Sequence, residues 1–251
     1  INQTLGCARF VYNHFLAVRR YNWQEKHEAV TYVKSSRLLT ELKCNPDFVW
    51  LKSVDSMALQ EALRNLDRAF QNFFKKQSGY PKFKSKHSHN QSYRTRNQSG
   101  GIRIIDGNIK LPRIGIVKTK LSREFEGRIL NATVSRTASG KYFVSLCVEM
   151  DIELLLGRNN GRQIGIDVGI KDFYSNDQGN TVANPHILKG MEKKLKRLQR
   201  SLSRKVKGSN NRNKARIKVA RLQERIANIR KDFLHKESTK LVRENQLIAV
   251  E

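Results

Sequence analysis

Two carboxylates occupy positions where their residue types and neighbours could support chemistry. Asp167 lies inside the apolar run IGIDVGI, and Glu251 follows the apolar run LIAV. An ionised carboxylate among buried strand residues is costly unless it is paired or binds a cation, so Asp167 is a candidate functional residue. The plainer interpretation is that Asp167 ends a strand and caps a loop, and that Glu251 is an ordinary surface residue.

Taken together, the two acids predict a metal site. The pattern is that of a ribonuclease H-like sheet, in which two parallel strands are joined by a helical connection and each carries an acid. This arrangement would bring the two carboxylates side by side. Such a pair suits Mg²⁺, a hard cation that prefers oxygen ligands. Two such ions, about 3.5–4 Å apart, can stabilise the attacking water and the leaving oxygen at a phosphodiester. The local candidates for a third acid, Asp172 and Asp177, stand in turns, where solvated acids are expected.

The composition points to a polyanionic partner. The chain of 251 residues has 49 Lys and Arg but only 22 Asp and Glu, a formal net charge of +27. Such an excess repels itself in a compact protein, so nucleic acid is the first candidate partner, and no membrane span is expected. Cys7, Cys44 and Cys147 lie far apart, which excludes a disulfide framework and a cysteine zinc site and indicates a reducing compartment.

Residues 1–75 are predicted to be mainly helical, because apolar residues recur at three- and four-residue spacing. Asp55 is a plausible N-cap for the last of these helices. The apolar stripe of that helix is expected to lie in the core. Its members are Met57, Ala62, Leu66, Ala69, Phe70 and Phe73.

Residues 76–160 are predicted to form a small β-barrel of five or six short strands. The runs GIRIID and NIKL flank a hairpin turn at Asp106-Gly107, and RILNATVSR and KYFVSLCVE flank the turn TASG. Alternation in the last run indicates a half-buried strand. The segment RNNG at residues 158–161 has the composition of a linker.

Residues 161–251 are predicted to contain three short strands, two helices and a final buried strand, LIAVE. Apolar spacing in the two helices predicts the seam of an antiparallel hairpin. The seam residues are Met191, Leu195, Leu198, Leu202, Val219, Leu222, Ile226, Ile229 and Phe233. Between Lys189 and Arg221 there are 14 Lys and Arg and one acid, Glu192, so the outer faces of the hairpin are basic.

Two basic regions are therefore candidates for contact with a phosphate backbone: this hairpin and the loop around residues 75–96. In the loop, aromatic residues interleave with Lys and Arg, which suits base stacking as well as phosphate binding. A solvated charged face is the plainer alternative. The candidate backbone contacts are Lys82, Lys84, Arg94, Arg96, Lys194, Arg197, Arg204 and Arg216.

Separated segments of the chain also carry a family resemblance. In order, they are LGCARFVYNHFL, GYPKFKSK, SYRT, GIDVGIKDFYSNDQG, RKDFLHKESTKLVREN and LIAVE. In sequence and succession they resemble the TnpB family of transposon-encoded, RNA-guided DNA endonucleases, which is related to type V CRISPR effectors. GIDVGIKDFYSNDQG is similar to the first motif of that family's RuvC nuclease domain.

The resemblance implies an α/β multidomain fold. A mainly helical recognition element would occupy residues 1–75, with a strand of the wedge domain before or around Ile1. A wedge β-barrel would follow at 76–160. A ribonuclease H-like (RuvC) domain with a basic helical hairpin insertion would occupy 161–251.

The resemblance also implies the catalytic groups. Asp167 and Glu251 would bind the catalytic Mg²⁺ or Mn²⁺. The family's third acid and its four-cysteine zinc ribbon would lie beyond Glu251, so Zn²⁺ is expected only in a missing C-terminal part. The start at Ile1 also suggests a fragment of a longer protein, and the chain as printed is not expected to cut DNA.

The implied partners are a guide RNA and a target double-stranded DNA, with one RNA bound to a protein monomer in the prokaryotic cytoplasm, at the nucleoid. A short DNA motif would be read by Ser56, Gln60, Arg64, Tyr93, Thr95 and Asn97. Gln can pair with adenine and Arg with guanine in the major groove. Each of these residues could instead contact phosphate or be merely exposed.

The sequence thus predicts an RNA-guided, metal-dependent DNA endonuclease. One alternative is a nuclease-dead, RNA-guided DNA-binding repressor, which a missing third acid would produce. The other is a non-enzymatic basic RNA-binding protein, which the buried-strand position expected for Asp167 disfavours.

Overall fold

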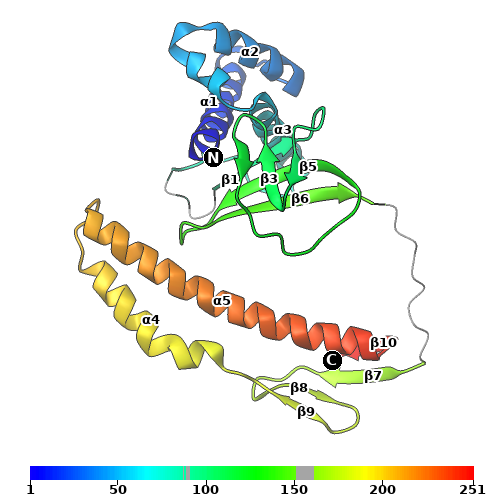
Figure 1. Ribbon diagram of the computed structural model, residues 1–251. Helices are drawn as coiled ribbons and strands as arrows, with labels where there is room; N and C mark the ends of the chain where they lie inside the picture. Colours follow the sequence, from blue (N-terminus) through cyan, green and yellow to red (C-terminus); the bar gives the residue numbers. More distant parts are fainter. Residues whose placement is uncertain (87, 89–90, 151–160) are drawn as a thin grey trace. The chain divides into compact units, whose positions relative to one another are not determined.

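The computed structural model describes residues 1–86, 88, 91–150 and 161–251 (Figure 1). These residues form two compact units: residues 1–137 with 141–150, and residues 161–251. Among the described residues, no helix combines the length and apolarity needed to cross a membrane.

The first unit begins with helices, as the sequence predicts. They are α1 (Asn2–Lys26), α2 (Tyr32–Cys44), the 3-10 helix η1 (Pro46–Ser53) and α3 (Ser56–Phe74). The Leu5 N–H donates to the Ile1 carbonyl at 3.0 Å, so the helical bonding starts at the first residue. The described residues therefore contain no wedge strand at Ile1, and a strand before Ile1 stays a prediction.

Asp55 caps the start of helix α3, as predicted: its carboxylate accepts the Met57 N–H at 3.1 Å. Its buried face is wider than the predicted stripe. Ala62 and Leu66 are buried as expected, but Leu59 and Leu63 are buried too. The reason is that α3 packs against α1, α2 and a β-strand at once, so more than one side of the helix is covered.

Six strands follow, in two antiparallel sheets. The first sheet, in the order β1-β5-β6, contains β1 (Gln91–Arg96), β5 (Arg128–Arg136) and β6 (Tyr142–Glu149). The second, in the order β2-β3-β4, contains β2 (Arg103–Ile105), β3 (Asn108–Leu111) and β4 (Gly115–Val117). The predicted strands and hairpins are confirmed, but the described residues form two separate sheets, and the closed barrel is not confirmed. Local turn signals specify hairpins, whereas closure depends on strands far apart in sequence.

Helices and strands of this unit share one hydrophobic core. Val11 of α1, Leu59 of α3, Ile109 of β3 and Val134 of β5 are all almost fully buried in the same cluster. The expected boundary between residues 75 and 76 therefore separates helices from strands but does not separate two cores.

The second unit is a sheet with a helical connection (Figure 1). Its four strands, in the order β10-β7-β8-β9, are β7 (Gln163–Asp167), β8 (Asp172–Asn176), β9 (Thr181–Ala183) and β10 (Leu247–Val250). β10 pairs with β7 in parallel, and the other pairs are antiparallel. Helices α4 (Ile187–Ser203) and α5 (Asn210–Glu244) lie between β9 and β10 in the sequence. The RNNG segment lies outside the described residues except for Gly161.

One expectation for this unit is wrong. The last strand was expected to be buried, but Leu247 and Val250 of β10 are 55 % and 66 % exposed. In the described residues β10 is an edge strand, so only β7 shields it within the sheet.

The helical hairpin is confirmed. Val219, Leu222 and Ile226 of α5 are buried, and the predicted seam residues of α4 are half-buried. Ser209 caps α5 by accepting the Arg212 N–H at 3.1 Å. The Arg212 guanidinium donates to the Leu202 and Lys205 carbonyls at 3.1 and 2.8 Å, so the same turn also caps the end of α4.

Candidate functional site

The parallel pair of β7 and β10 places the two predicted catalytic acids. Val250 is opposite Ile166 in the ladder. Beyond that pair, the Glu251 N–H donates to the Ile166 carbonyl at 3.0 Å, and the Val168 N–H donates to the Glu251 carbonyl at 3.5 Å. These two bonds flank Asp167, so Asp167 and Glu251 lie opposite each other on neighbouring strands.

Both side chains are exposed, which differs from the sequence argument. Asp167 ends β7 instead of lying within a buried strand, and Ile170 beyond it is 90 % exposed. The strand stops because the chain bends at Gly169, whose N–H donates to the Phe173 carbonyl at 3.3 Å. The desolvation cost expected for Asp167 is therefore absent from the described structure.

The neighbouring acids do not complete a triad. Asp177 stands in the exposed turn after β8, with its N–H bonded to the Gly165 carbonyl at 3.0 Å, and Asp172 is the first residue of β8. Within the described ranges no three His, Cys, Asp or Glu side chains are grouped so as to hold a metal ion. Two carboxylates on adjacent strand ends nevertheless fit Mg²⁺, which is commonly held by one or two carboxylates together with waters and substrate phosphate.

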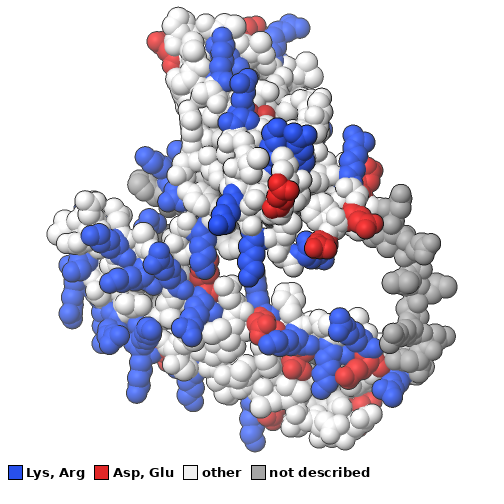
Figure 2. Space-filling model, in the orientation of Figure 1, with Lys and Arg blue, Asp and Glu red and all other residues white. Residues whose placement is uncertain are grey.

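A second feature is a cationic groove on the outer face of α4. Its lining residues are Lys193, Lys196, Arg197, Arg200, Ser201, Arg204 and Lys205. Figure 2 shows Lys and Arg side chains gathered over this hairpin. Glu192 pairs with Lys196 at 2.6 Å, and this hydrogen bond and charge lower the pKa of Glu192.

The groove contains two of the four predicted backbone contacts in this unit, Arg197 and Arg204. Lys194 on α4 and Arg216 on α5 are exposed but do not line the groove. The groove residues recur at intervals of three and four along the chain, on the side of α4 opposite the apolar seam. One amphipathic helix therefore provides both the cationic groove and the apolar seam.

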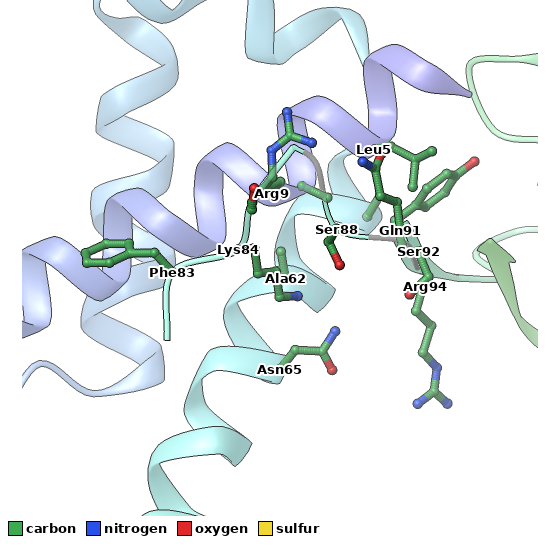
Figure 3. A pocket seen from close by; sticks show the side chains of 14 residues that line it. Leu5, Arg9, Ala62, Asn65, Phe83, Lys84, Ser88, Gln91, Ser92 and Arg94 are labelled. Carbon is green, nitrogen blue, oxygen red and sulfur yellow. The ribbon is translucent and has the colours of Figure 1, made fainter. Parts of the chain in front are cut away.

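A cavity of about 440 Å³ lies in the first unit among α1, α3 and residues 83–85, 88 and 91–94 (Figure 3). Three cations line it, Arg9, Lys84 and Arg94, together with hydroxyl and amide side chains, and none of its described lining residues is a carboxylate. The structure thus brings the predicted residues Lys84 and Arg94 together with Arg9, which the sequence argument missed because Arg9 lies on an otherwise ordinary helix. Lys82 and Arg96 are exposed outside the cavity lining.

Asn13 fixes the position of Lys84. Its side chain accepts the Lys84 N–H at 2.8 Å and donates to the Lys84 carbonyl at 2.9 Å. The Lys84 ammonium lies 4.2 Å from the centre of the Tyr12 ring, and desolvation there lowers the pKa of Lys84.

The predicted motif-reading residues of β1 point inward. Tyr93 and Thr95 are 4 % and 1 % exposed, and the Thr95 hydroxyl donates to the Asp55 carboxylate that caps α3. Burial first, and the charge of Asp55 second, raise the pKa of Tyr93 to about 12. Asn97 binds the backbone of Ile102 and Ile129 with its side-chain amide.

The other three lie in the first half of α3 and are more accessible. Ser56 and Arg64 are exposed, and Arg64 lies 4.7 Å from the centre of the Tyr32 ring. Gln60 is half-buried and accepts hydrogen bonds from Tyr32 and Ser36, both at 3.1 Å.

Sequence reasoning missed Glu61, which organises the arginines of this region. It is 3 % exposed, and its carboxylate lies 2.6 Å from Arg96, 3.5 Å from Arg64 and 4.0 Å from Arg94. Glu61 stands in the largely apolar sequence MALQEALRNL, at helical spacing from apolar residues. That position could have indicated a buried acid.

The fold and these sites define a strongly basic, mixed α/β protein with cationic surfaces suited to a polyanion. The family model described as "Probable transposase" matches residues 145–251, and a model described as "Helix-turn-helix domain" matches residues 1–28. The chain belongs to this transposase family, the TnpB family that its motifs resemble.

Three curated relatives are similar in sequence. A candidate RNA-guided DNA endonuclease of Streptomyces pristinaespiralis is 40 % identical over 100 % of this chain and 62 % of its own length. A candidate RNA-guided DNA endonuclease of Escherichia coli, InsQ, is 35 % identical over 98 % of this chain and 60 % of its own length. The virulence protein VsdF of Salmonella dublin is 36 % identical over 35 % of this chain and 81 % of its own length. The chain thus spans about three fifths of the first two relatives.

Among solved structures, a cryo-EM structure of a CRISPR-Cas12f ternary complex aligns with 99 % of this chain and 62 % of its own chain. The TM-score is 0.39 and the sequence identity is 14 %, and a likeness of this size does not establish a common fold.

Proposed function

We propose that this chain belongs to an RNA-guided, metal-dependent DNA endonuclease of a transposon, which cuts DNA beside a short motif read by the protein. The names of the two long relatives and the transposase family support this assignment. The observation that carries it is the placement of Asp167 and Glu251 opposite each other on parallel strands.

In this proposal, Asp167 and Glu251 hold Mg²⁺ or Mn²⁺. A bound divalent ion at this position would supply charge stabilisation at a phosphodiester and a more acidic water. The β7–β10 hydrogen bonds hold the backbones of Asp167 and Glu251 opposite each other, so both carboxylates would be available to one ion. The third acid and the zinc ribbon of the family stay predictions.

The cationic surfaces would bind the nucleic acids. The α4 groove presents Arg197 and Arg204 at the spacing of one helical face, which suits a phosphate backbone. The cavity with Arg9, Lys84 and Arg94 suits a further phosphate group. Recognition of a guide–target duplex would then depend on its backbone and shape.

Motif reading is proposed for the accessible residues Ser56, Gln60 and Arg64. Tyr93, Thr95 and Asn97 would instead hold the backbone beneath this surface, because their side chains are buried or hydrogen-bonded within the protein. We also propose that the protein acts as a monomer, binds one guide RNA and works in the prokaryotic cytoplasm.

Substitution of the acid pair tests the proposal. The full-length protein is purified with its co-expressed RNA, that RNA is sequenced, and a plasmid library carrying the matching target beside randomised flanks is offered with Mg²⁺ or Mn²⁺. Asp167→Ala and Glu251→Gln are expected to abolish cutting and to leave RNA-directed DNA binding intact, since both residues are exposed and their loss should not disturb folding. Asp106→Asn, at an exposed hairpin turn with φ 48°, is the matched control and should cut normally. Cutting at the parent rate by either acid variant would reject the metal assignment.

A nuclease-dead, RNA-guided repressor is the second candidate, and it would result if the expected third acid is missing from the protein. The same experiment separates the two. A repressor would bind the matching target with RNA and leave it uncut in both metals.

A further inference from the structure

Four aromatic rings gather at the C-terminal end of α3: Phe70, Phe73, Phe74 and Tyr80, here called the aromatic cluster. Tyr80 meets Phe70 and Phe73 edge-on, at ring-centre distances of 5.7 and 5.4 Å. Phe74 lies 6.4 Å from Phe70, nearly parallel to it, and 5.4 Å from Phe73. Such edge-on and offset contacts are favourable aromatic geometries, so the rings support one another.

The end of α3 holds this arrangement in place. Lys76 has the left-handed φ of 57°, and its N–H donates to the Phe73 carbonyl at 2.9 Å. The N–H groups of Gln77 and Ser78 both donate to the Asn72 carbonyl, at 2.9 and 3.3 Å. These bonds fold the chain back along the helix, which carries Tyr80 onto the rings.

The cluster is open to solvent on one side. Phe74 is 75 % exposed and Tyr80 is 44 % exposed, whereas Phe70 and Phe73 are half-buried. The Arg19 guanidinium lies 5.1 Å from the centre of the Phe70 ring. Phe74 is therefore the ring with most of its surface free, and its supporting neighbours are fixed.

Exposed basic residues flank the open ring in the sequence. Arg68, Lys75, Lys76 and Lys82 are exposed and lie within eight positions of Phe74 in the sequence. The carboxylate of Asp67, in the same turn of α3 as Phe70, is already bound by Arg19 at 2.8 Å and by Gln71 at 2.9 Å. The accessible chemistry is thus an exposed aromatic face with exposed basic residues close to it in the sequence.

We propose that the aromatic cluster is a stacking platform for unpaired bases of single-stranded nucleic acid, with Phe74 as the stacking ring. Aromatic rings with adjacent Lys and Arg bind single strands without sequence preference, because every base has a stacking face and every nucleotide a phosphate. A duplex keeps its base faces covered and would not use the ring. The identity of the partner rests on the proposed function, whereas base stacking at Phe74 requires neither Mg²⁺ nor cutting.

The experiment measures binding of fluorescent oligo(U) and oligo(dT) to the full-length protein without RNA, in a chelator, by anisotropy at several salt concentrations. Phe74→Ala and Phe74→Leu are compared with the parent, and Val33→Ala, at a residue that is 71 % exposed on α2, is the control for loss of an exposed apolar side chain. Both Phe74 variants should bind single strands about tenfold more weakly, with an unchanged salt slope and unchanged duplex affinity. Phe74→Trp should restore or exceed parent affinity.

The two oligonucleotides identify the source of the strand. A loss confined to oligo(U) points to guide RNA, a loss confined to oligo(dT) points to a displaced DNA strand, and either supports the platform. Parent affinity in Phe74→Ala, or an equal loss for duplex, would overturn it. Loss of self-association in Phe74→Ala, seen by sedimentation with unaltered oligonucleotide binding, would assign the ring to a second copy and also overturn it. Because no cleavage is measured, an inactive Asp167 variant should still show the Phe74 effect, which keeps this test separate from that of the nuclease.

Discussion

The Arg96 guanidinium on β1 donates to the Glu61 carboxylate on α3 at 2.6 Å, and this pair joins the helices of the first unit to its β1-β5-β6 sheet. Glu61 is almost fully buried, while Arg96 remains 47 % exposed in its side chain. One buried acid therefore holds an arginine at the surface beside Arg64 and Arg94.

Glu61→Gln should destabilise the first unit by about 1–3 kcal/mol, because three arginines lose a buried anion and its charge-assisted hydrogen bonds. Urea unfolding measures the loss. Glu28→Gln removes the acid of an exposed pair with Lys34 at 3.1 Å and should leave the free energy of unfolding essentially unchanged. Equal stability of the Glu61 variant and the parent would show that the arginines do not depend on this carboxylate.

Neutralising the α4 groove should weaken nucleic-acid binding in a salt-dependent way. The double substitution Arg197→Gln, Arg204→Gln removes two groove cations, so the slope of log affinity against log salt should fall by about 1 for each residue that contacts phosphate. Filter binding of the guide RNA at several salt concentrations measures the slope.

The matched control removes two lysines that are already paired with acids. Lys34→Gln, Lys236→Gln has the same change in net charge, but Lys34 pairs with Glu28 at 3.1 Å and Lys236 with Asp232 at 2.7 Å. Its salt slope should match the parent. If groove and control variants change the slope equally, overall charge and not the groove governs binding.

Tyr93 should make stability depend on pH in the alkaline range. Its folded pKa of about 12 lies above the ordinary value of 10.0, because burial and the Asp55 charge disfavour the phenolate. The neutral phenol therefore stabilises the fold fully below about pH 10, and this contribution, about 2–3 kcal/mol, is lost as the pH rises through 10 to 12. Urea unfolding at several alkaline pH values should show a shallower pH dependence for Tyr93→Phe than for the parent. Identical pH dependence in Tyr93→Phe and the parent would contradict the assignment.

Gly127, just before β5, should tolerate no side chain. It has φ 116°, and a Cβ there would collide with the Glu149 carbonyl oxygen at the end of β6. Gly127→Ala is expected to destabilise the first unit by about 3 kcal/mol or more. Gly140 lies in the turn between the same two strands, with φ 88° and open space around it. Gly140→Ala should therefore lower the free energy of unfolding by only about 1–2 kcal/mol, the cost of a left-handed backbone for a residue with a side chain. Thermal unfolding compares the two, and an equal cost would remove the steric argument.

Local patterns in the sequence specified most elements. The Asp55 cap, the Asp106-Gly107 hairpin and the seam of α4 and α5 all follow from residues close together in the chain, and the structure contains each of them. Such features depend on backbone bonds and side-chain periods within one or two elements, so they can be read before the tertiary structure is known.

Arrangements between distant segments could not be read in the same way. The two separate sheets, the buried Glu61 among its arginines, and the return of Tyr80 onto α3 each depend on which surfaces meet. The outward position of Asp167 also depends on where β7 ends, and an apolar run alone does not mark that residue.

The sequence by itself determined the charge, the helices, the hairpins and the acidic residues after two apolar runs. Only the tertiary structure decided that β7 and β10 pair in parallel at the register that sets Asp167 opposite Glu251, and that Tyr93 and Thr95 face the core. The physical reason is that residue spacing fixes hydrogen bonds within an element, whereas strand register and burial result from the packing of the whole unit.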